Sequence, residues 1–490
     1  MVSSISNVGT ISSAGLGSGL DVSGIVTQLM ALERRPLQLL ESQATNLNTK
    51  LSTYGKLQSY FSALRDKSND LVSSTLWSAT VAASTDAAAV KVSTGTNAAT
   101  GSYAVEVQKL AKGQTITTGT ALANKDATLN EGTLTIELGA WTGLAAPDEF
   151  APKSGSAPVA IAIGAGETSL AKIRDKINGA GAGVVASIIT DASGARLSLR
   201  SKDTGAENAF RVSVTETADD GVAGTGLSAL AYDATVPASP MTRSQLAINA
   251  EATVNGIPVS SAGNTLNNVV DGLTISLLKE TTAPVDVTVS ADSAAIKQKL
   301  TDFVAAFNDL SGFLRTQMAY NADSKTGGIL QGDQSVMSLQ RQLRDVLNQA
   351  STASGTWTRL SEVGMSLKAD GSMELSATKL DNALGNLPEL KKLLATDGAD
   401  NASSGFMRRW KRLADTSLGS GGTFETRKEG INANLSRNAK TQDGMTLRLA
   451  QTEARLRAQY STLDTRMATL NGLSGYLTQQ ITAFNNNNGN

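Results

Sequence analysis

The sequence predicts an α+β protein of several domains, in which helices from both ends of the chain pair and antiparallel β domains are inserted between them. Three observations predict this fold. Apolar residues recur with a heptad period near both ends, the period changes to two between residues 79 and 292, and 490 residues exceed one ordinary domain. Seven of the nine prolines lie between Pro147 and Pro284, where long helices are therefore not expected.

The longest apolar seam lies at the end of the chain. Its members are spaced by three, four or seven residues: Met445, Leu449, Leu456, Tyr460, Leu463, Met467, Leu470, Leu477, Ile481 and Phe484. A heptad seam of this length predicts a helix that packs along its length on other helices. A core helix of a globular bundle is the alternative interpretation.

The first helix is predicted to follow a small, glycine-rich arm. Its apolar residues are Val22, Ile25, Leu29 and Leu32. Asp21 or Ser23 is expected at the N-cap, and Pro36 is expected to end or kink the helix. The arm does not match the dinucleotide fingerprint, because Leu20 stands where its last glycine would be.

A second helical seam follows Pro36 and ends near Trp77. Its members are Leu47, Leu51, Tyr54, Leu57, Phe61, Leu64 and Leu71. This helix is expected to pair with the C-terminal region. The two ends of the chain would then lie together and leave the middle as an insertion.

The middle of the chain predicts antiparallel strands separated by turns. Apolar residues alternate at Tyr103, Val105 and Val107, at Leu134, Ile136 and Leu138, at Val159, Ile161 and Ile163, at Leu197 and Leu199, and at Val285, Val287 and Val289. One helix is predicted over residues 169–178, ending at Gly179.

Helical periodicity returns at Ser293. The apolar residues are Ile296, Leu300, Phe303, Phe307, Leu310 and Leu314, then Val336, Leu339, Leu343 and Val346. A small hairpin is expected around Val363, Met365 and Leu367. A loop is expected over residues 419–422 and a frayed tail over residues 485–490.

Composition excludes several classes of function. Net charge is −1, which disfavours a general nucleic-acid binder, although residues 79–295 hold 14 Lys and Arg against 21 Asp and Glu. The chain has no Cys and no His, which removes disulfides, thiolate and imidazole metal sites and histidine bases. No cofactor is expected, no apolar run is long enough to insert in a membrane, and no secretory signal is recognised. These absences predict a protein that is not an enzyme.

Four segments resemble one known family. Residues 17–21 (Gly-Ser-Gly-Leu-Asp) and the following helix resemble the N-terminal signature of the bacterial flagellar filament cap family, also called hook-associated protein 2. Residues 169–214 resemble the hook IN motif of flagellins and cap proteins. Residues 252–277 are similar to the start of the family's C-terminal half, and residues 460–481 to its last helix.

The resemblance implies four structural parts. Residues 1–42 and 445–490 would form a terminal helical leg, and residues 43–78 and 293–444 a helical coiled-coil domain. The head would comprise a β domain (79–112 and 243–292) and a further inserted β domain (113–242) that holds the hook IN-like motif.

The resemblance also implies function, location and partners. The protein would form a homo-oligomeric ring of about five or six subunits at the distal filament tip, where it promotes polymerisation of exported flagellin and prevents its loss. It would leave the cell through the flagellar type III apparatus and be extracellular. Its partners would be flagellin, hook–filament junction proteins, a cytosolic export chaperone at the C-terminal helix, and in some members host mucin or a host surface.

The exposed seams are the expected partner-binding residues. They are Ile25, Leu29, Leu32, Leu456, Tyr460, Leu463, Met467, Leu470, Leu477 and Ile481. Two other functions stay open. A hook–filament junction protein would share the helical ends, and a surface adhesin would share the thin β domains without needing heptad seams at both termini.

Overall fold

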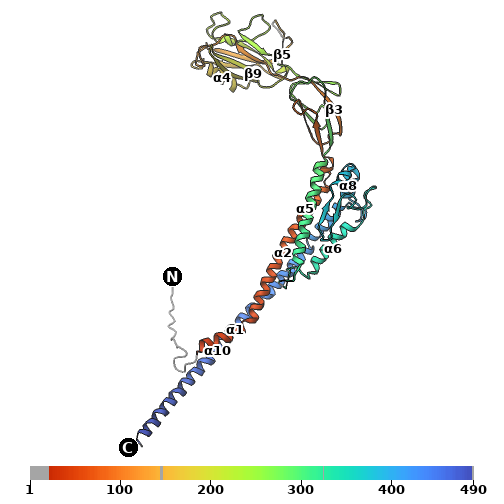
Figure 1. Cartoon of the computed structure of the whole chain (residues 1–490). Coiled ribbons are helices and arrows are strands. Elements are labelled where there is room, and N and C mark those ends of the chain that lie inside the picture. Colours follow the sequence, from red (N-terminus) through yellow and green to blue (C-terminus); the bar gives the residue numbers. More distant parts are fainter. Residues whose placement is uncertain (1–20, 144–146, 324, 488–490) are drawn as a thin grey trace. The chain divides into compact units, whose positions relative to one another are not determined.

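The computed structural model describes residues 21–143, 147–323 and 325–487, and Figure 1 shows the chain. It divides into two compact units. The helical unit comprises Met1–Leu76 and Ala294–Asn490, and the β unit comprises Trp77–Ser293. The predicted mixture of long terminal helices and antiparallel sheets is confirmed.

The helical unit contains helices of very different length and two short hairpins. The helices are α1 (Val22–Glu33), α2 (Arg35–Val72), α3 (Ser74–Ser78, at the boundary with the β unit), α5 (Ser293–Met318), α6 (Gln334–Asn348), α7 (Ala377–Leu384), α8 (Leu387–Ala395), α9 (Phe406–Leu418) and α10 (Thr423–Asn487). The hairpins pair β17 (Tyr320–Asn321) with β18 (Thr326–Gly327) and β19 (Met365–Leu367) with β20 (Met373–Leu375). The second hairpin is the one that the sequence predicts.

The start of α1 and its junction with α2 follow from local chemistry. The carboxylate of Asp21 accepts a hydrogen bond of 2.8 Å from the backbone N–H of Gly24, so Asp21 is the N-cap. The helix is interrupted at Arg34. Pro36 lies in the first turn of α2, where its missing N–H costs no helical hydrogen bond. The predicted interruption at Pro36 is thus confirmed. The predicted arm over residues 1–20 lies outside the described residues.

The heptad positions of α2 and α5 form the core of the helical unit. Phe61 of α2 packs edge-on against Phe424 of α10 with ring centroids 5.2 Å apart, and Phe303 of α5 lies 4.8 Å from Trp410 of α9. The residues predicted on these helices that are buried are Tyr54, Leu57, Phe61, Leu64, Leu71, Ile296, Leu300, Phe303, Phe307, Leu310 and Leu314. On α6 the last predicted position is wrong. Leu347 is buried and Val346 is half-exposed, because the last step of the apolar stripe is four residues rather than three.

Helices α2 and α10 run antiparallel. Phe61 meets Phe424, Gln58 accepts from Lys428 at 3.4 Å, and Gln43 accepts from Asn438 at 3.4 Å. Helix α2 therefore packs on the first third of α10. The sequence predicts that α2 pairs with the C-terminal region as a whole. The seam that begins at Met445 contacts α1 instead.

The β unit is built from antiparallel strands and one α-helix. The strands are β1 (Thr80–Ser84), β2 (Val90–Thr94), β3 (Gly101–Lys109), β4 (Thr115–Thr118), β5 (Gly132–Trp141), β6 (Phe150–Pro152), β7 (Val159–Ile163), β8 (Val184–Asp191), β9 (Gly194–Ser201), β10 (Ala209–Glu216), β11 (Met241–Gln245), β12 (Ala250–Val254), β13 (Ile257–Ser261), β14 (Thr265–Asn267), β15 (Leu273–Leu277) and β16 (Val285–Ala291). Their order is β1-β16-β3-β12-β13 in the largest sheet and β14-β15-β2 in the smallest. One four-stranded sheet has the order β10-β5-β6, with β7 also paired to β5. The other four-stranded sheet has the order β11-β4-β9-β8.

Three buried clusters lie within the β unit. One surrounds Trp141 and Phe210, a second surrounds Val105 and Val287, and a small third one consists of Ala98, Leu273 and Val289. The apolar residues predicted to alternate in β3, β5 and β16 face one of these cores. The residues between them are mostly more exposed. The predicted alternation is confirmed in β3, β7 and β16. In β9 Ser198, between Leu197 and Leu199, is buried as well, and in β5 the alternation holds at Leu134 and Ile136 but not at Leu138, which is half-buried.

The helix α4 (Leu170–Gly179) packs on β8. Ser169 caps its N-terminus by accepting from the N–H of Lys172, and its apolar residues Leu170, Ile173 and Ile177 are buried. The helix ends at Gly179, the residue that the sequence predicts as its terminator, and Ala180 is the C-cap. Gly181, with φ +66°, is the first glycine after the helix in the left-handed region.

Two further expectations concern α10 and membranes. The loop over residues 419–422 is present, but α10 continues to Asn487, so the tail predicted from residue 485 is helical as far as it is described. Residues 488–490 lie outside the described part. Within the described ranges, no helix combines the length and apolar character needed to span a membrane.

Candidate partner-binding site

One face of α1 is buried against α10. Val22, Val26 and Met30 recur every four residues and are at most 5% exposed. They form one cluster with Leu449 of α10, and Met445, Leu456 and Tyr460 pack around it partly buried. A spacing of four places side chains on one helix face, so these residues attach α1 to α10.

The residues predicted for partner binding on α1 lie outside that cluster. Ile25 is half-buried, while Leu29 is 37% and Leu32 is 57% exposed. The prediction took three of the four apolar residues that define this helix in the sequence and left out Val22, which is the one of the four that belongs to the cluster with α10. The structure leaves Leu29 and Leu32 available to another molecule.

The side chains of the C-terminal seam become less buried toward the C-terminal end of α10. Leu456 and Tyr460 are half-buried by α1, and Met467 is half-buried. The remaining predicted residues are exposed by 43 to 60%: Leu463, Leu470, Leu477 and Ile481. Figure 1 shows this end of α10 extending past α1 with no other described helix beside it. Of the ten predicted residues, Leu456 and Tyr460 contact α1, Ile25 and Met467 are half-buried, and the other six are exposed.

Sequence reasoning missed two members of this surface. Leu473 and Tyr476 are 56% and 57% exposed, and both lie between Leu470 and Leu477. The heptad template stepped directly over these seven residues. Leu473 was detectable, because it follows Leu470 by three residues and precedes Leu477 by four.

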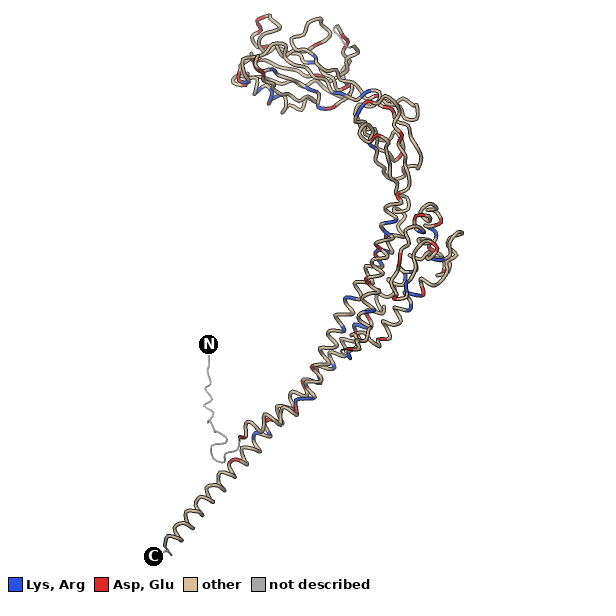
Figure 2. The backbone as a smooth tube through the Cα atoms, in the orientation of Figure 1, with Lys and Arg blue, Asp and Glu red and all other residues tan. Residues whose placement is uncertain are grey.

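The exposed end of α10 has no charge. From Met467 to Asn487 the helix contains no Lys, Arg, Asp or Glu, as Figure 2 shows. An uncharged helix with a row of exposed Leu, Ile and Phe is poorly matched to water and well matched to another apolar helix surface. This end of α10 is the main candidate site.

The base of α10 is fixed by a buried ionic cluster. Asp333, the N-cap of α6, pairs with Lys50 of α2 at 2.9 Å and with Arg427 of α10 at 2.8 Å, and its side chain is 1% exposed. Burial by itself raises the pKa of Asp333, but the two cations outweigh it and lower the pKa to about 2. Burial also raises the pKa of the neighbouring Tyr54. The carboxylate thus joins three helices at the end of α10 opposite to the exposed seam.

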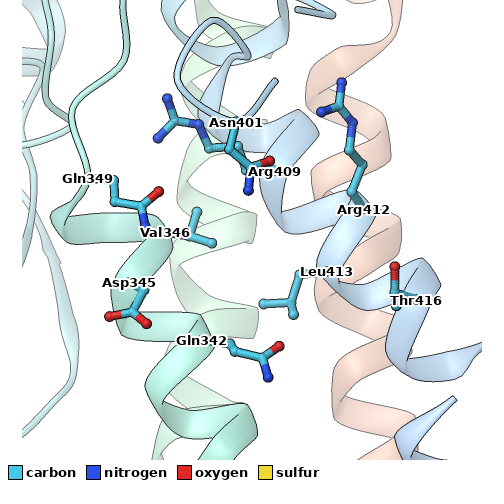
Figure 3. Close-up of a pocket in the computed structure, with 9 residues that line it drawn as sticks. All are labelled: Gln342, Asp345, Val346, Gln349, Asn401, Arg409, Arg412, Leu413 and Thr416. Atoms are coloured by element: carbon cyan, nitrogen blue, oxygen red, sulfur yellow. The ribbon is translucent and has the colours of Figure 1, made fainter. Parts of the chain in front are cut away.

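A hollow of about 440 Å³ separates α6 from α9 (Figure 3). One side consists of Gln342, Asp345 and Val346 of α6 with its C-cap Gln349, and the other side consists of Asn401, Arg409, Arg412, Leu413 and Thr416. No nucleophile with an adjacent base lines it. Among the described residues no group of His, Cys, Asp or Glu is arranged to hold a metal ion.

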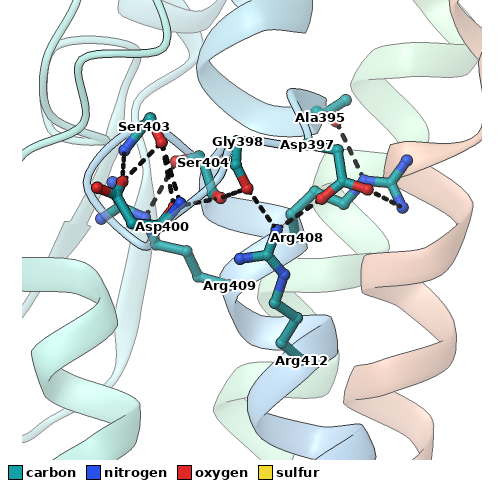
Figure 4. Close-up of polar contacts among 9 residues, drawn as sticks. All are labelled: Ala395, Asp397, Gly398, Asp400, Ser403, Ser404, Arg408, Arg409 and Arg412. Atoms are coloured by element: carbon teal, nitrogen blue, oxygen red, sulfur yellow. Dashed lines mark hydrogen bonds and ion pairs between the residues drawn. The ribbon is translucent and has the colours of Figure 1, made fainter.

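The arginines of this hollow serve the loop that precedes α9 (Figure 4). Arg409 donates to the carbonyls of Ser404 at 3.0 Å and Ala402 at 3.2 Å, and burial lowers its pKa. Arg412 donates to Asp397 at 2.6 Å, which lowers the pKa of that carboxyl. These bonds fix a loop, so we assign the hollow no chemical role.

Comparison with known proteins identifies the family. Residues 18–114 match the flagellar hook-associated protein 2 N-terminus, residues 247–472 match its C-terminus, and residues 150–203 match the flagellin hook IN motif. The flagellar hook-associated protein 2 of Escherichia coli (strain K12) is 31% identical over 98% of this chain and 99% of its own length. The B-type protein of Pseudomonas aeruginosa is 34% identical over 76% of this chain and 77% of its own.

A solved structure agrees with these sequence matches. The crystal structure of the flagellar cap protein FliD D1-D2-D3 domains from Escherichia coli is 30% identical, with a TM-score of 0.56, and covers 78% of this chain and 99% of that chain. The fold, the order of the matched segments and the nearly full-length identity lead to one conclusion: this chain belongs to the flagellar hook-associated protein 2 family.

Proposed function

We propose that the protein is a flagellar filament cap. A homo-oligomeric ring at the distal tip would promote polymerisation of exported flagellin and prevent its loss. Family membership supports the location at the flagellum, and one observation supports the mechanism: the uncharged, exposed seam at the end of α10.

The seam suits a contact that forms only in the assembled filament. Leu463, Leu470, Leu477 and Ile481 lack a covering element among the described residues, while Asp333 and the aromatic core hold the other end of α10. Burying each apolar side chain contributes about 1.5–3 kcal/mol, so several such residues give a firm contact. Leu29 and Leu32 of α1 would add a second strip to the same site.

The remaining parts of the proposal concern domains and partners. Residues 1–42 and 445–490 would be the leg, and residues 43–78 and 293–444 the helical domain. The head would be residues 79–112 with 243–292 and residues 113–242. Export through the flagellar type III apparatus, a cytosolic chaperone at the C-terminal helix and contacts with hook–filament junction proteins complete the proposal.

The test is a double substitution in the seam. Leu463→Ala/Leu470→Ala should reduce flagellin elongation at filament tips by about tenfold or more, because interface leucines are lost while no core is opened. The matched control is Leu39→Ala/Leu447→Ala, which removes two leucines of similar exposure, 66% and 63%, outside the seam. Elongation should be unchanged in the control.

Thermal unfolding separates docking from folding. The helical unit should unfold at the same temperature in wild type and in Leu463→Ala/Leu470→Ala. If the helical unit is destabilised, the seam belongs to its structural core and this proposal is wrong. Native mass of the full-length protein should in addition give a closed ring of a few copies; a strict monomer at all concentrations would contradict the ring.

A further inference from the structure

One row of α10 is formed by arginines. Arg437, Arg448, Arg455 and Arg466 are separated by 11, 7 and 11 residues, and all four are exposed. An α-helix has about 3.6 residues per turn, so steps of 7 and 11 return to nearly the same direction. The four guanidinium groups therefore follow one line along the helix, which we call the arginine row.

No carboxylate neutralises the arginine row within the described part of the chain. Arg437 donates to the side-chain oxygen of Asn434, and Arg448, Arg455 and Arg466 make no ion pair there. The acidic residues of α10 are off the row, since none is 7, 11 or 18 residues from any of its arginines: Glu425, Glu429, Asp443, Glu453 and Asp464. Glu453, for example, pairs with Arg457 and Arg34 instead.

The same line continues as an apolar row. Leu473 follows Arg466 by 7 residues and Phe484 follows Leu473 by 11, and they are 56% and 69% exposed. One straight face of α10 is thus basic up to Arg466 and apolar beyond it. A surface hollow of about 460 Å³ lies on this face, lined by Arg455, Ala458, Gln459, Thr462, Leu463 and Arg466.

The arginine row remains accessible when α1 is in place. Helix α1 contacts α10 through Leu449, Leu456 and Tyr460. Leu449 follows Arg448 by one residue and Leu456 follows Arg455 by one, so the contact lies about 100° around the helix from the row. A partner can therefore bind the row without displacing α1.

We propose that the arginine row and its apolar continuation bind one acidic α-helix of a partner protein. Carboxylates of that helix meet Arg448, Arg455 and Arg466, and its apolar stripe covers Leu473 and Phe484. The inference rests on the proposed function, in which the partner is a flagellin subunit, and adds which chemistry that subunit presents. Because the charges occupy fixed positions along the helix, they set the axial position of the partner, which an uncharged seam alone does not fix.

Three other possible occupants of this surface do not match its charge or its apolar part. Residues 1–20 contain no acidic side chain, so they cannot neutralise the row. A second copy of the same face would place arginine against arginine, which is repulsive. A phosphate polymer would match the arginines but would leave Leu473 and Phe484 uncovered. A helix that is acidic in one part and apolar in the next matches both halves.

Two synthetic helical peptides test the proposal with the full-length protein. Both carry the same apolar stripe; one has Glu at steps of 7 and 11 residues, and the other has Gln at those positions. Fluorescence anisotropy in about 50 mM salt should show the Glu peptide binding about tenfold more tightly, and about 500 mM salt should remove the difference. Equal binding of the two peptides, or no binding of either, would overturn the proposal.

Matched charge reversals locate the site. Arg455→Glu/Arg466→Glu should abolish the preference for the Glu peptide, whereas Lys440→Glu/Arg457→Glu makes the same change of charge off the row and should keep it. Circular dichroism should be equal in both variants, because all four side chains are exposed. A preference that survives Arg455→Glu/Arg466→Glu would contradict the assignment.

Binding of the protein to filament tips is the measurement that separates this inference from the proposed function. If the row selects the Glu peptide but Arg455→Glu/Arg466→Glu binds filament tips as tightly as wild type, flagellin is not the acidic partner. If the tip is not bound even by wild type, the cap proposal fails while the peptide result still decides the chemistry of the row.

Discussion

Arg427 of α10 donates to Asp333 at the N-terminus of α6 across 2.8 Å, and the carboxylate is 1% exposed. Replacing Asp333 by Asn keeps an N-cap but leaves the cations of Lys50 and Arg427 without their counter-ion. Breaking a buried pair from one side costs about 3 kcal/mol. We expect Asp333→Asn to lower the free energy of unfolding of the helical unit by about that amount in urea denaturation.

The control for this prediction is Asp370→Asn. Asp370 pairs with Arg315 at 3.0 Å, but both side chains are more than half exposed. Its loss should change the free energy of unfolding little, because exposed ion pairs contribute little to stability. Equal effects of the two substitutions would show that the Asp333 cluster is not a special anchor of α10.

Acid should destabilise the helical unit between about pH 4 and pH 2. The pKa of Asp333 is about 2 in the folded chain against an ordinary value of 3.8. A lowered folded-state pKa means that the stabilisation is complete above the unfolded value and is lost as pH falls through the folded value. Asp333→Asn should therefore flatten the fall of unfolding free energy over this range. A variant with the wild-type pH dependence would disprove the assignment to Asp333.

Near neutrality the unfolding free energy should be almost constant. The chain has no His and no Cys, and side chains of other types titrate far from pH 7 unless strongly perturbed. Thermal unfolding at pH 6, 7 and 8 in equal ionic strength checks this. A midpoint that changes by several degrees across this range would indicate a titrating group outside those described.

Two leucines of α10 should differ sharply when replaced by Ala. Leu449 is 7% exposed under α1, so Leu449→Ala should weaken the attachment of α1 by about 2 kcal/mol. Leu473 is 56% exposed, and Leu473→Ala should change stability by less than about 0.5 kcal/mol. Hydrogen exchange of the α1 amides is the measurement, and faster exchange in Leu473→Ala than in Leu449→Ala would contradict the arrangement.

A buried amide should control the β unit alone. Gln114 is fully buried, donates to the carbonyl of Phe210 at 2.7 Å and accepts from the indole of Trp141 at 2.9 Å. Gln114→Ala leaves both partners unsatisfied and should cost about 2–4 kcal/mol. Exchange should speed up in the strands around Trp141 and stay unchanged in α2 and α5. Thr242→Ala, at an exposed strand position, is the control and should have little effect.

The parts of the fold that the sequence predicts are those in which periodicity acts locally. The heptads of α2 and α5 and the alternation in β3, β5 and β16 each point to a buried face that the structure contains. Periodicity does not specify which helix covers a face. That is why the sequence paired the α2 seam with the C-terminal region as a whole, whereas α2 packs on the first third of α10.

The candidate site shows the same division. Exposure of Leu463, Leu470, Leu477 and Ile481 agrees with a seam that has no partner in its own chain, although nothing yet tests their role in binding. Leu456 and Tyr460 have the same spacing and are half-covered by α1, which no spacing rule distinguishes. The ionic cluster of Asp333 was missed because its members are 283 and 94 residues distant from it along the chain, at Lys50 and Arg427.

The graded burial of α10 gives one helix several levels of local stability. Phe424 is fully buried and Ile431 is 2% exposed, whereas every residue from 469 to 485 is exposed. Local opening costs least where few apolar contacts must be broken, so the helix opens from its C-terminal end inward. Opening from this end first breaks contacts with α1 at Tyr460, and then at Leu449, which α1 buries. The terminal helix therefore has a base that is held by side-chain packing and an end whose opening breaks few apolar contacts.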